Sequence, residues 1–345
     1  MSQSTGRPGE TAAPVLSVRA LSVEFPVKGG TITPVREVDL DLRRGGRLGI
    51  VGESGSGKSL TALALMRLIH PPGAVRGQVL IDGQNLLDLP ERRMVHFRGS
   101  RIAMVYQNPL SALNPVYTIG RQIAEAVRLA RPMPRRRARE RAVELLDEVG
   151  VPEAARRVDS YPHEFSGGMR QRVVIAMALA GEPDVVIADE PTTALDVTTQ
   201  ARVIDLLSSL ADRHGTSVVL ITHDLAVAAS FCDDINVMYA GRIVERSDVP
   251  GFFENQVHPY SEALMSSVCG MDIDVDQPIR ALPGYPPLPG RLPPGCTFAP
   301  RCQAATARCS VETPEPLRLP TGREAECLFA AERATRRPTE EIDHG

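Results

Sequence analysis

The chain has 345 residues, of which 43% are hydrophobic and 23% charged, and its formal net charge is −3. This length can hold one large domain and a smaller one. The near balance of charges excludes a bulk attraction to nucleic acid or to an anionic membrane, and no apolar run reaches the roughly 18 to 20 residues that cross a bilayer.

The N-terminal residues 1–14 are polar and lack the apolar segment of a secretory signal. They are predicted to be a disordered tail, and the protein is expected to stay in the cytoplasm. Alternation of apolar and polar residues predicts strands at Val15–Phe25 and Val35–Leu42. A further strand, at Gly77–Asp82, is expected at the edge of a sheet as part of a hairpin.

An apolar run, a glycine-rich turn and a run of helix formers follow one another over residues 48–66. The turn reads G-x-x-x-x-G-K-S, and between a strand and a helix this pattern binds the phosphates of a nucleotide. Backbone N–H groups surround the phosphate oxygens, the lysine reaches the β- and γ-phosphates, and the final serine ligates Mg²⁺. The nucleotide-binding residues predicted in this loop are Gly52, Ser54, Gly55, Gly57, Lys58 and Ser59.

The alternative is a glycine turn that holds a lysine by chance, and the composition argues against it. Among 39 basic residues only Lys28 and Lys58 are lysine, so arginine is used wherever a positive charge is enough. A planar guanidinium cannot replace a compact ammonium group in a tight phosphate cradle. Lysine at position 58 is therefore expected to be required by the chemistry.

Three later apolar runs are predicted to be buried strands that end in polar side chains. The run 101–106 ends in Gln107, 184–188 in Asp189 and Glu190, and 217–222 in His223. Ligands gather at the carboxyl ends of parallel strands. Asp189 is expected to hold Mg²⁺ and Gln107 to touch the same site, while Glu190 polarises water for attack on the γ-phosphate and His223 contacts that phosphate. Taken singly, the glutamine and the histidine are weak signals.

The segment Tyr117–Gly150 is helical by periodicity and carries a cluster of six arginines, which also suggests a nucleic-acid site. No aromatic residues for base stacking are interleaved with them. We therefore interpret the cluster as the solvated face of a helix.

A second anion site is predicted where Ser166 caps a helix and Gly167 and Gly168 expose their backbone N–H groups. It has neither a lysine nor a metal ligand, so it cannot bind a nucleotide alone. Further along, 192–196 is predicted to be a turn that leads into another helix.

The order of these motifs resembles the ATP-binding subunits of ABC transporters over residues 15 to about 255. The resemblance implies an α/β fold, with a P-loop NTPase (ABC ATPase) core, an antiparallel β edge and an α-helical subdomain at about 108–165. It makes Gln107 the Q-loop residue, Ser166–Arg170 the signature, and Asp196 the D-loop residue. Phe25 is placed either to stack on the adenine ring or, equally weighted, as a core residue at a strand end.

Some segments are similar to the dipeptide, oligopeptide and nickel importers: Gly52–Gly57, Gln107–Pro115 and Phe165–Met169 in the core, and His258–Tyr260 and Leu282–Pro287 in a C-terminal domain at 256–345. Methionine at 169 is more similar to the D-type than to the F-type ATPase of such importers. The resemblance implies ATP-driven import of peptides, or alternatively of nickel or another small solute. It also implies a second, F-type ATPase, two permease subunits, an extracytoplasmic solute-binding protein and a place at the cytoplasmic face of the membrane.

Four cysteines, Cys296, Cys302, Cys309 and Cys327, crowd a segment rich in proline and glycine that buries too little apolar surface to fold unaided. Disulfides are not expected in the cytoplasm. A [4Fe–4S] cluster, which related importer ATPases carry here, is the first interpretation, with Zn²⁺ and free thiols as alternatives. Cys232 and Cys269 are expected to be small buried hydrophobic residues.

Two incomplete phosphate sites on one chain predict that two ATPase subunits clamp ATP head to tail and reopen after hydrolysis. The rival functions are a non-transport ABC ATPase of DNA repair or translation and a module that binds ATP without cleaving it. The segment 108–165 is too short for the coiled coils of repair types, translation types usually carry two motif sets, and the presence of Glu190 and His223 disfavours a non-hydrolysing module.

Overall fold

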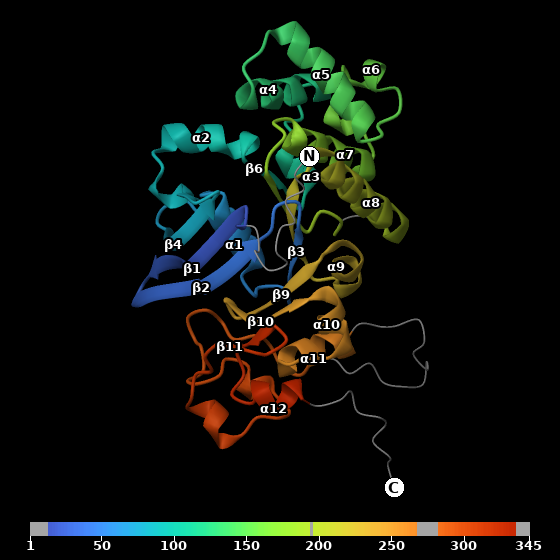
Figure 1. The fold of residues 1–345 in the computed structure, drawn as a ribbon. Helices are drawn as coiled ribbons and strands as arrows, with labels where there is room; N and C mark the ends of the chain where they lie inside the picture. Colours follow the sequence, from blue (N-terminus) through green and yellow to red (C-terminus); the bar gives the residue numbers. More distant parts are fainter. Residues whose placement is uncertain (1–12, 194–195, 268–281, 336–345) are drawn as a thin grey trace, which may run out of the picture.

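A four-stranded and an eight-stranded sheet organise the chain (Figure 1). The computed structural model describes residues 13–193, 196–267 and 282–335. Most of the predicted tail 1–14, and Cys269, lie outside the described residues. Within these ranges, no helix is both long and apolar enough to cross a membrane.

The four-stranded sheet is antiparallel, in the order β2-β1-β4-β5. Its strands are β1 (Leu16–Val27), β2 (Gly30–Leu42), β4 (Ala74–Ile81) and β5 (Gln84–Asn85). The predicted strand at Gly77–Asp82 corresponds to β4, but its expected edge position is wrong, because β4 pairs with β1 on one side and with the two-residue β5 on the other. β2 begins earlier than predicted, because β1 and β2 form one long hairpin that closes at Val27 and Gly30.

The eight-stranded sheet has the order β11-β12-β10-β9-β3-β8-β7-β6. Its strands are β3 (Arg47–Val51), β6 (Ile102–Val105), β7 (Val185–Asp189), β8 (Ser217–Thr222), β9 (Asp234–Tyr239), β10 (Arg242–Asp248), β11 (Leu317–Arg318) and β12 (Glu324–Ala325). The five strands from β9 to β6 pair in parallel, and β6, β7 and β8 are buried throughout. Burial on both faces explains their continuous apolar runs. Parallel pairing brings their carboxyl ends to one edge of the sheet.

Helices flank the sheets and connect their strands (Figure 1). They are α1 (Lys58–Leu65), α2 (Glu91–Ser100), α3 (Pro109–Ala112), α6 (Ala154–Arg157), α7 (Gly167–Leu179), α8 (Val197–His214), α9 (Leu225–Phe231), α10 (Val249–Glu254), α11 (Pro259–Ser266) and α12 (Ala330–Ala334). Short 3₁₀ turns lie at Leu86–Asp88, Pro162–Glu164, Ala299–Arg301 and Ala307–Ser310.

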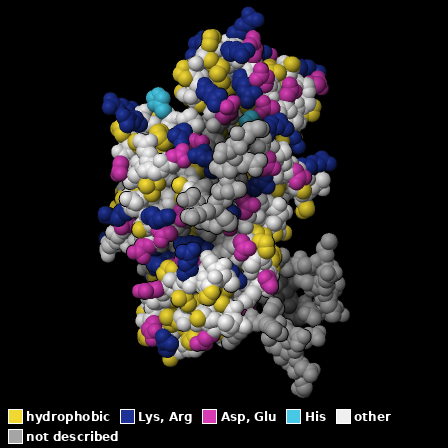
Figure 2. All heavy atoms as spheres, viewed as in Figure 1, with side chains coloured by type: hydrophobic (Ala, Val, Ile, Leu, Met, Phe, Trp, Pro, Cys, Tyr) yellow, Lys and Arg dark blue, Asp and Glu magenta, His cyan; other side chains and the backbone are white. Residues whose placement is uncertain are grey.

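The expected helix at Tyr117–Gly150 is two helices, α4 (Ile119–Ala130) and α5 (Arg135–Glu148). Pro132 and Pro134 lie between them, and proline lacks the N–H that a continuous helix would need. With α6 they form the lobe at the top of Figure 1. Most of the arginines in the predicted cluster pair with nearby carboxylates, for example Arg139 with Asp159 at 2.7 Å. Basic and acidic side chains are interspersed over this lobe, which is typical of a solvated surface (Figure 2).

The C-terminal segment extends the large sheet rather than lying apart from it. β12 pairs with the outer side of β10, placing Ala325 opposite Glu245. The Glu245 carboxylate is buried and accepts hydrogen bonds from the backbone N–H groups of Val257 and His258 and from the Arg323 guanidinium. The buried residues Val257, Leu319, Ala325 and Ala330 form a small hydrophobic cluster beneath this pairing. The same sheet therefore spans the expected boundary near residue 255.

Candidate functional site

The glycine-rich loop connects the end of β3 to the start of α1 and is pressed against neighbouring backbone. Gly52 has a φ of +153°, and a Cβ there would lie 2.2 Å from the Met238 carbonyl oxygen. Gly57, with φ +111°, caps α1, and its Cβ would lie 2.9 Å from the Pro34 carbonyl oxygen. Only glycine fits such close approaches in this backbone region. The loop thus directs the N-terminus of α1, a favourable place for an anion, toward its own interior.

Lys58 is the first residue of α1, and its side chain turns back into the loop. It is only 4% exposed, and its Nζ donates hydrogen bonds to the carbonyl oxygens of Gly52 at 2.7 Å and Glu53 at 2.9 Å. Burial lowers the pKa of Lys58, and the negative charges of Glu190 and Asp189 oppose that shift. The loop therefore contains a confined ammonium group next to two carboxylates.

Asp189 ends β7 beside the first turn of α1. Its buried carboxylate accepts a hydrogen bond from the Ser59 hydroxyl at 3.1 Å. Burial raises the pKa of Asp189, an effect that the hydrogen bond from Ser59 reduces. A hydroxyl and a carboxylate oxygen are ligands that Mg²⁺ prefers, and a divalent cation would offset the burial of the charge. This pair of side chains fits the predicted Mg²⁺ site.

Glu190 follows Asp189 with a φ of +46°, a left-handed conformation that is unfavourable for this residue type and marks functional sites. Its Oε2 accepts hydrogen bonds from Gln107 Nε2 and Thr193 Oγ1, each at 2.8 Å, and its Oε1 lies 3.3 Å from His223 Nδ1. The ends of β6, β7 and β8 thus meet at this carboxylate. Gln107 was expected to touch the metal site, and its amide instead donates to Glu190. Thr193 was not predicted, because its one signal in the sequence is a hydroxyl three residues after the glutamate.

One cavity of about 1310 Å³ brings the phosphate loop together with the strand ends. Its lining includes the loop residues 52–55 and 57–59, together with Gln107, Glu190 and His223. The C-terminal segment contributes Leu264, Ser267 and 285–289 to the same lining, which no sequence motif indicated. A cavity of this size accommodates a nucleotide.

Besides Asp189, five residues predicted for the nucleotide site do not line this cavity. Phe25 is not among the residues that line the cavity; its ring packs close to Gly73, where a Cβ would lie 2.6 Å from a ring carbon. Asp196 is exposed and caps α8, its carboxylate accepting the Thr199 N–H at 3.0 Å, which lowers its pKa. Ser166 is exposed and caps α7 through the Met169 N–H, and neither it nor the two following glycines line the cavity.

Comparison with known proteins decides the family. Residues 35–193 match the family described as ABC transporter, and residues 244–309 match the family described as oligopeptide/dipeptide transporter, C-terminal region. The oligopeptide transport ATP-binding protein OppD of Haemophilus influenzae is 44% identical over 320 residues, which are 93% of this chain and 98% of that protein. The chain belongs to the ABC transporter family, as an ATP-binding subunit.

Two further similar proteins support this assignment, one over nearly the whole chain and one over part of it. A Brucella abortus protein described as a peptide import ATP-binding protein is 49% identical over 95% of this chain and 97% of its own length. The dimeric ATP-binding cassette MJ0796, solved in a post-hydrolysis state with ADP and Pi, has a TM-score of 0.61 and 30% identity over 68% of this chain and 98% of its own. The predicted ABC ATPase fold and the assignment of the chain to an ATPase family are therefore confirmed.

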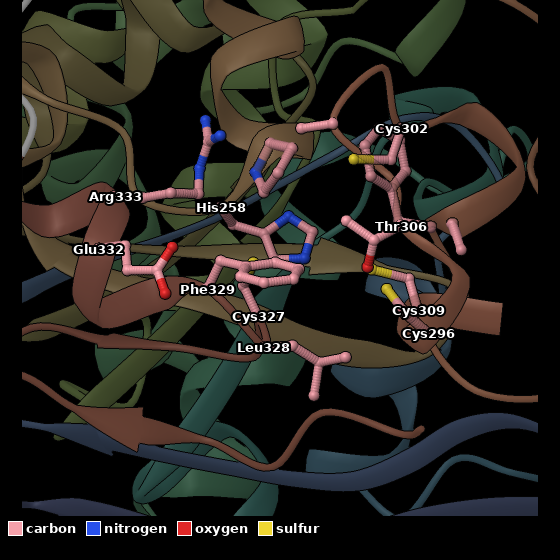
Figure 3. A pocket seen from close by; sticks show the side chains of 14 residues that line it. His258, Cys296, Cys302, Thr306, Cys309, Cys327, Leu328, Phe329, Glu332 and Arg333 are labelled. Carbon is pink, nitrogen blue, oxygen red and sulfur yellow. The ribbon is translucent and has the colours of Figure 1, made fainter. Parts of the chain in front are cut away.

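The four C-terminal cysteines of this ABC subunit line one cavity of about 230 Å³ (Figure 3). Cys296 and Cys309 lie next to each other, and the backbone N–H of Cys296 donates to the carbonyl of Cys309. Burial raises the pKa values of Cys296, Cys302 and Cys327. As arranged among the described residues, the side chains do not form a group of three or more that could hold a metal ion.

The remaining cysteine of the described residues, Cys232, is buried in the core, as expected, and burial raises its pKa to about 12.

Proposed function

We propose that this chain hydrolyses ATP to power the import of oligopeptides, working beneath membrane permease subunits as the ATP-binding component of an ABC importer. The observation that carries the proposal is the meeting of Lys58, Glu190 and His223 around one nucleotide-sized cavity, with Asp189 behind it on the Ser59 hydroxyl. The relatives named for peptide and oligopeptide transport, matched over nearly their whole length, support peptides as the cargo.

Within this function, the loop and Lys58 would bind the phosphates, Ser59 and Asp189 would hold Mg²⁺, and Glu190 would accept a proton from the attacking water. Gln107 and Thr193 both donate to Glu190 Oε2, so they set the position of that carboxylate. His223 approaches its other oxygen and would contact the γ-phosphate. Mg²⁺, when bound, neutralises charge on the phosphate oxygens.

The second ATPase subunit of the proposed assembly is supported by the position of Ser166. The helix start at Ser166 is exposed and lies outside the cavity of its own chain, so it is free to meet a nucleotide held by another subunit. MJ0796, to which the chain is similar, is dimeric. We expect the partner to be a different, F-type ATPase, with a solute-binding protein delivering peptide from outside the membrane.

A test of the function uses the complex that co-purifies with the tagged full-length chain from its own cells. ATP hydrolysis in proteoliposomes should rise when peptide-loaded binding protein is added, and labelled peptide should accumulate inside. Ser166→Arg should lower hydrolysis by about tenfold or more, since it removes one hydrogen-bonding face of the shared nucleotide. The matched control, Ser209→Arg on the exposed face of α8, should have no effect. Stimulation by Ni²⁺ but not by peptide, or full hydrolysis by an isolated single copy carrying Ser166→Arg, would contradict the proposal.

We further propose that the cysteine cavity holds a metal centre, a [4Fe–4S] cluster in preference to Zn²⁺. Support comes from four cysteines around one small cavity in a segment with little apolar core of its own. Burial raises the pKa values of three of the thiols, so a metal bound here would displace their protons to gain thiolate ligands. The arrangement described above would have to tighten to bring the sulfurs onto one centre.

The full-length protein purified without oxygen should be brown and contain iron and sulfide. Cys302→Ser should remove the visible absorbance and most of the iron, because it removes one of four ligands. Cys232→Ala, a cysteine change outside the cavity, should leave both unchanged. A colourless anaerobic preparation with one zinc per chain would assign zinc instead, and a preparation without either metal would contradict a metal centre.

A further inference from the structure

An arginine of the C-terminal segment contacts the phosphate loop directly. Arg301 is 7% exposed, and its guanidinium donates from Nη1 to Glu53 Oε2 at 2.7 Å and from Nη2 to Glu53 Oε1 at 3.0 Å. Glu53 is the residue that follows Gly52 in the loop. Such a two-point pair between a guanidinium and a carboxylate fixes orientation as well as distance. A third bond, from Arg301 Nε to the Pro283 carbonyl at 2.8 Å, holds the arginine in place.

The backbone of Glu53 is held by the same segment. Its N–H donates to the Tyr260 hydroxyl at 2.8 Å. The Tyr260 ring is buried against Tyr239 at the end of β9 and Phe298, with ring centroids 4.5 and 5.4 Å away. Residues outside the loop therefore hold Glu53 at two points, one on its carboxylate and one on its peptide nitrogen.

The third polar group of Glu53, its carbonyl, accepts a hydrogen bond from Lys58 Nζ. A change in the position of Glu53 therefore moves one of the two groups that orient the lysine. We propose that Arg301 is a positioning residue of the nucleotide site, which fixes Glu53 and, through its backbone, the phosphate loop and Lys58. This inference deepens the proposed ATPase function and rests on it, and it makes the C-terminal segment a working part of the nucleotide site.

Arg301 also belongs to the cysteine-bearing segment, so it links that segment to the phosphate loop. It ends the 3₁₀ turn Ala299–Arg301, which is bracketed by Cys296 and Cys302. The backbone N–H groups of Ala299 and Cys302 donate to the carbonyls of Cys296 and Ala299, so the turn is tied to both cysteines. The position of the guanidinium is thus set by the fold of the cysteine-bearing segment.

The alternative is that Arg301 only fastens the C-terminal segment to the core. The two roles differ in what they predict for nucleotide binding by folded protein. A fastening residue changes the melting temperature and leaves the affinity of the folded fraction unchanged. A positioning residue changes the affinity for MgATP, and does so through Glu53.

The test is a calorimetric titration of the purified full-length chain with MgATP, together with circular dichroism and thermal melting. Arg301→Gln should weaken MgATP binding by about tenfold or more in protein that remains folded, and Arg301→Lys should recover part of the loss. Arg308→Gln is the matched control, because Arg308 belongs to the same segment and forms its ion pair with the exposed Glu312 rather than with the phosphate loop. It should bind MgATP as the wild type does.

Glu53→Gln is a second variant that tests the same inference, and it keeps the test available if Arg301→Gln fails to fold. It should weaken MgATP binding by itself, and the double variant should lose less than the two single losses combined, because the two side chains act through one contact. Wild-type affinity in folded Arg301→Gln, or in Glu53→Gln, would overturn the inference. A wild-type chain that binds no MgATP would instead overturn the proposed function, and this inference with it.

Discussion

Glu190→Gln should abolish most ATP hydrolysis by the assembled transporter and trap it with ATP between closed ATPase subunits. The amide preserves the size of the side chain and can keep hydrogen bonds with Gln107 and Thr193, but it cannot accept the proton from the attacking water. A positioned general base contributes on the order of 10²- to 10⁴-fold, so we expect a loss of that size. Steady-state phosphate release measures the loss of hydrolysis. The ratio of ATP to ADP in the isolated complex measures the trapping of ATP.

The control for this variant is Glu140→Gln, which removes a carboxylate from the exposed face of α5. It should hydrolyse ATP at the wild-type rate. Hydrolysis at the wild-type rate in Glu190→Gln would exclude Glu190 as the base. A loss accompanied by failure to bind ATP would mean that the carboxylate supports binding, which also contradicts the assigned role.

Lys58→Arg should weaken MgATP binding almost as severely as Lys58→Ala, by roughly 10- to 100-fold for the loss of a charged hydrogen-bonding group. The arginine variant keeps the positive charge, so the expected loss of MgATP affinity comes from the different shape of the side chain. Lys58 Nζ lies within 3 Å of two loop carbonyls and is nearly inaccessible to solvent, leaving no room for a planar guanidinium. Titration of the full-length chain with MgATP measures the effect, and melting curves report whether the fold survives.

Lys28→Arg is the matched control, since Lys28 is the other lysine of the chain and is exposed. It should bind MgATP normally. Normal binding by Lys58→Arg would mean that charge alone is needed at position 58, and that the near absence of lysine from this chain says nothing about the loop.

Much of the candidate site could be predicted because its residues follow strongly apolar runs. Gln107, Asp189, Glu190 and His223 each lie at or within two residues of the end of a buried strand, and parallel pairing then brings the strand ends together. The conformation of the glycine-rich loop could be predicted from the spacing of its glycines, lysine and serine. These signals are contained in short stretches of sequence, so no knowledge of distant contacts was needed.

The parts that could not be predicted depend on contacts between distant residues. Arg301 and Glu53 are 248 positions apart, and neither has a local pattern that points to the other. The two-residue strands β5 and β12 are too short to show an alternating pattern in the sequence. Neither the interior position of β4 nor the extension of the large sheet beyond β10 could therefore be predicted. The break between α4 and α5 was different, because its two prolines are present in the sequence and were outweighed by the helical periodicity around them.

The pairing of β12 with β10 has a practical consequence for anyone who shortens this protein. A chain ended near residue 255 would leave the outer edge of β10 without its neighbour, and Glu245 would lose its bonds to Val257, His258 and Arg323. An uncovered strand edge is a template on which another copy can add its own backbone. Such a fragment is expected to self-associate and precipitate. The catalytic core should therefore be expressed together with the segment that completes its sheet.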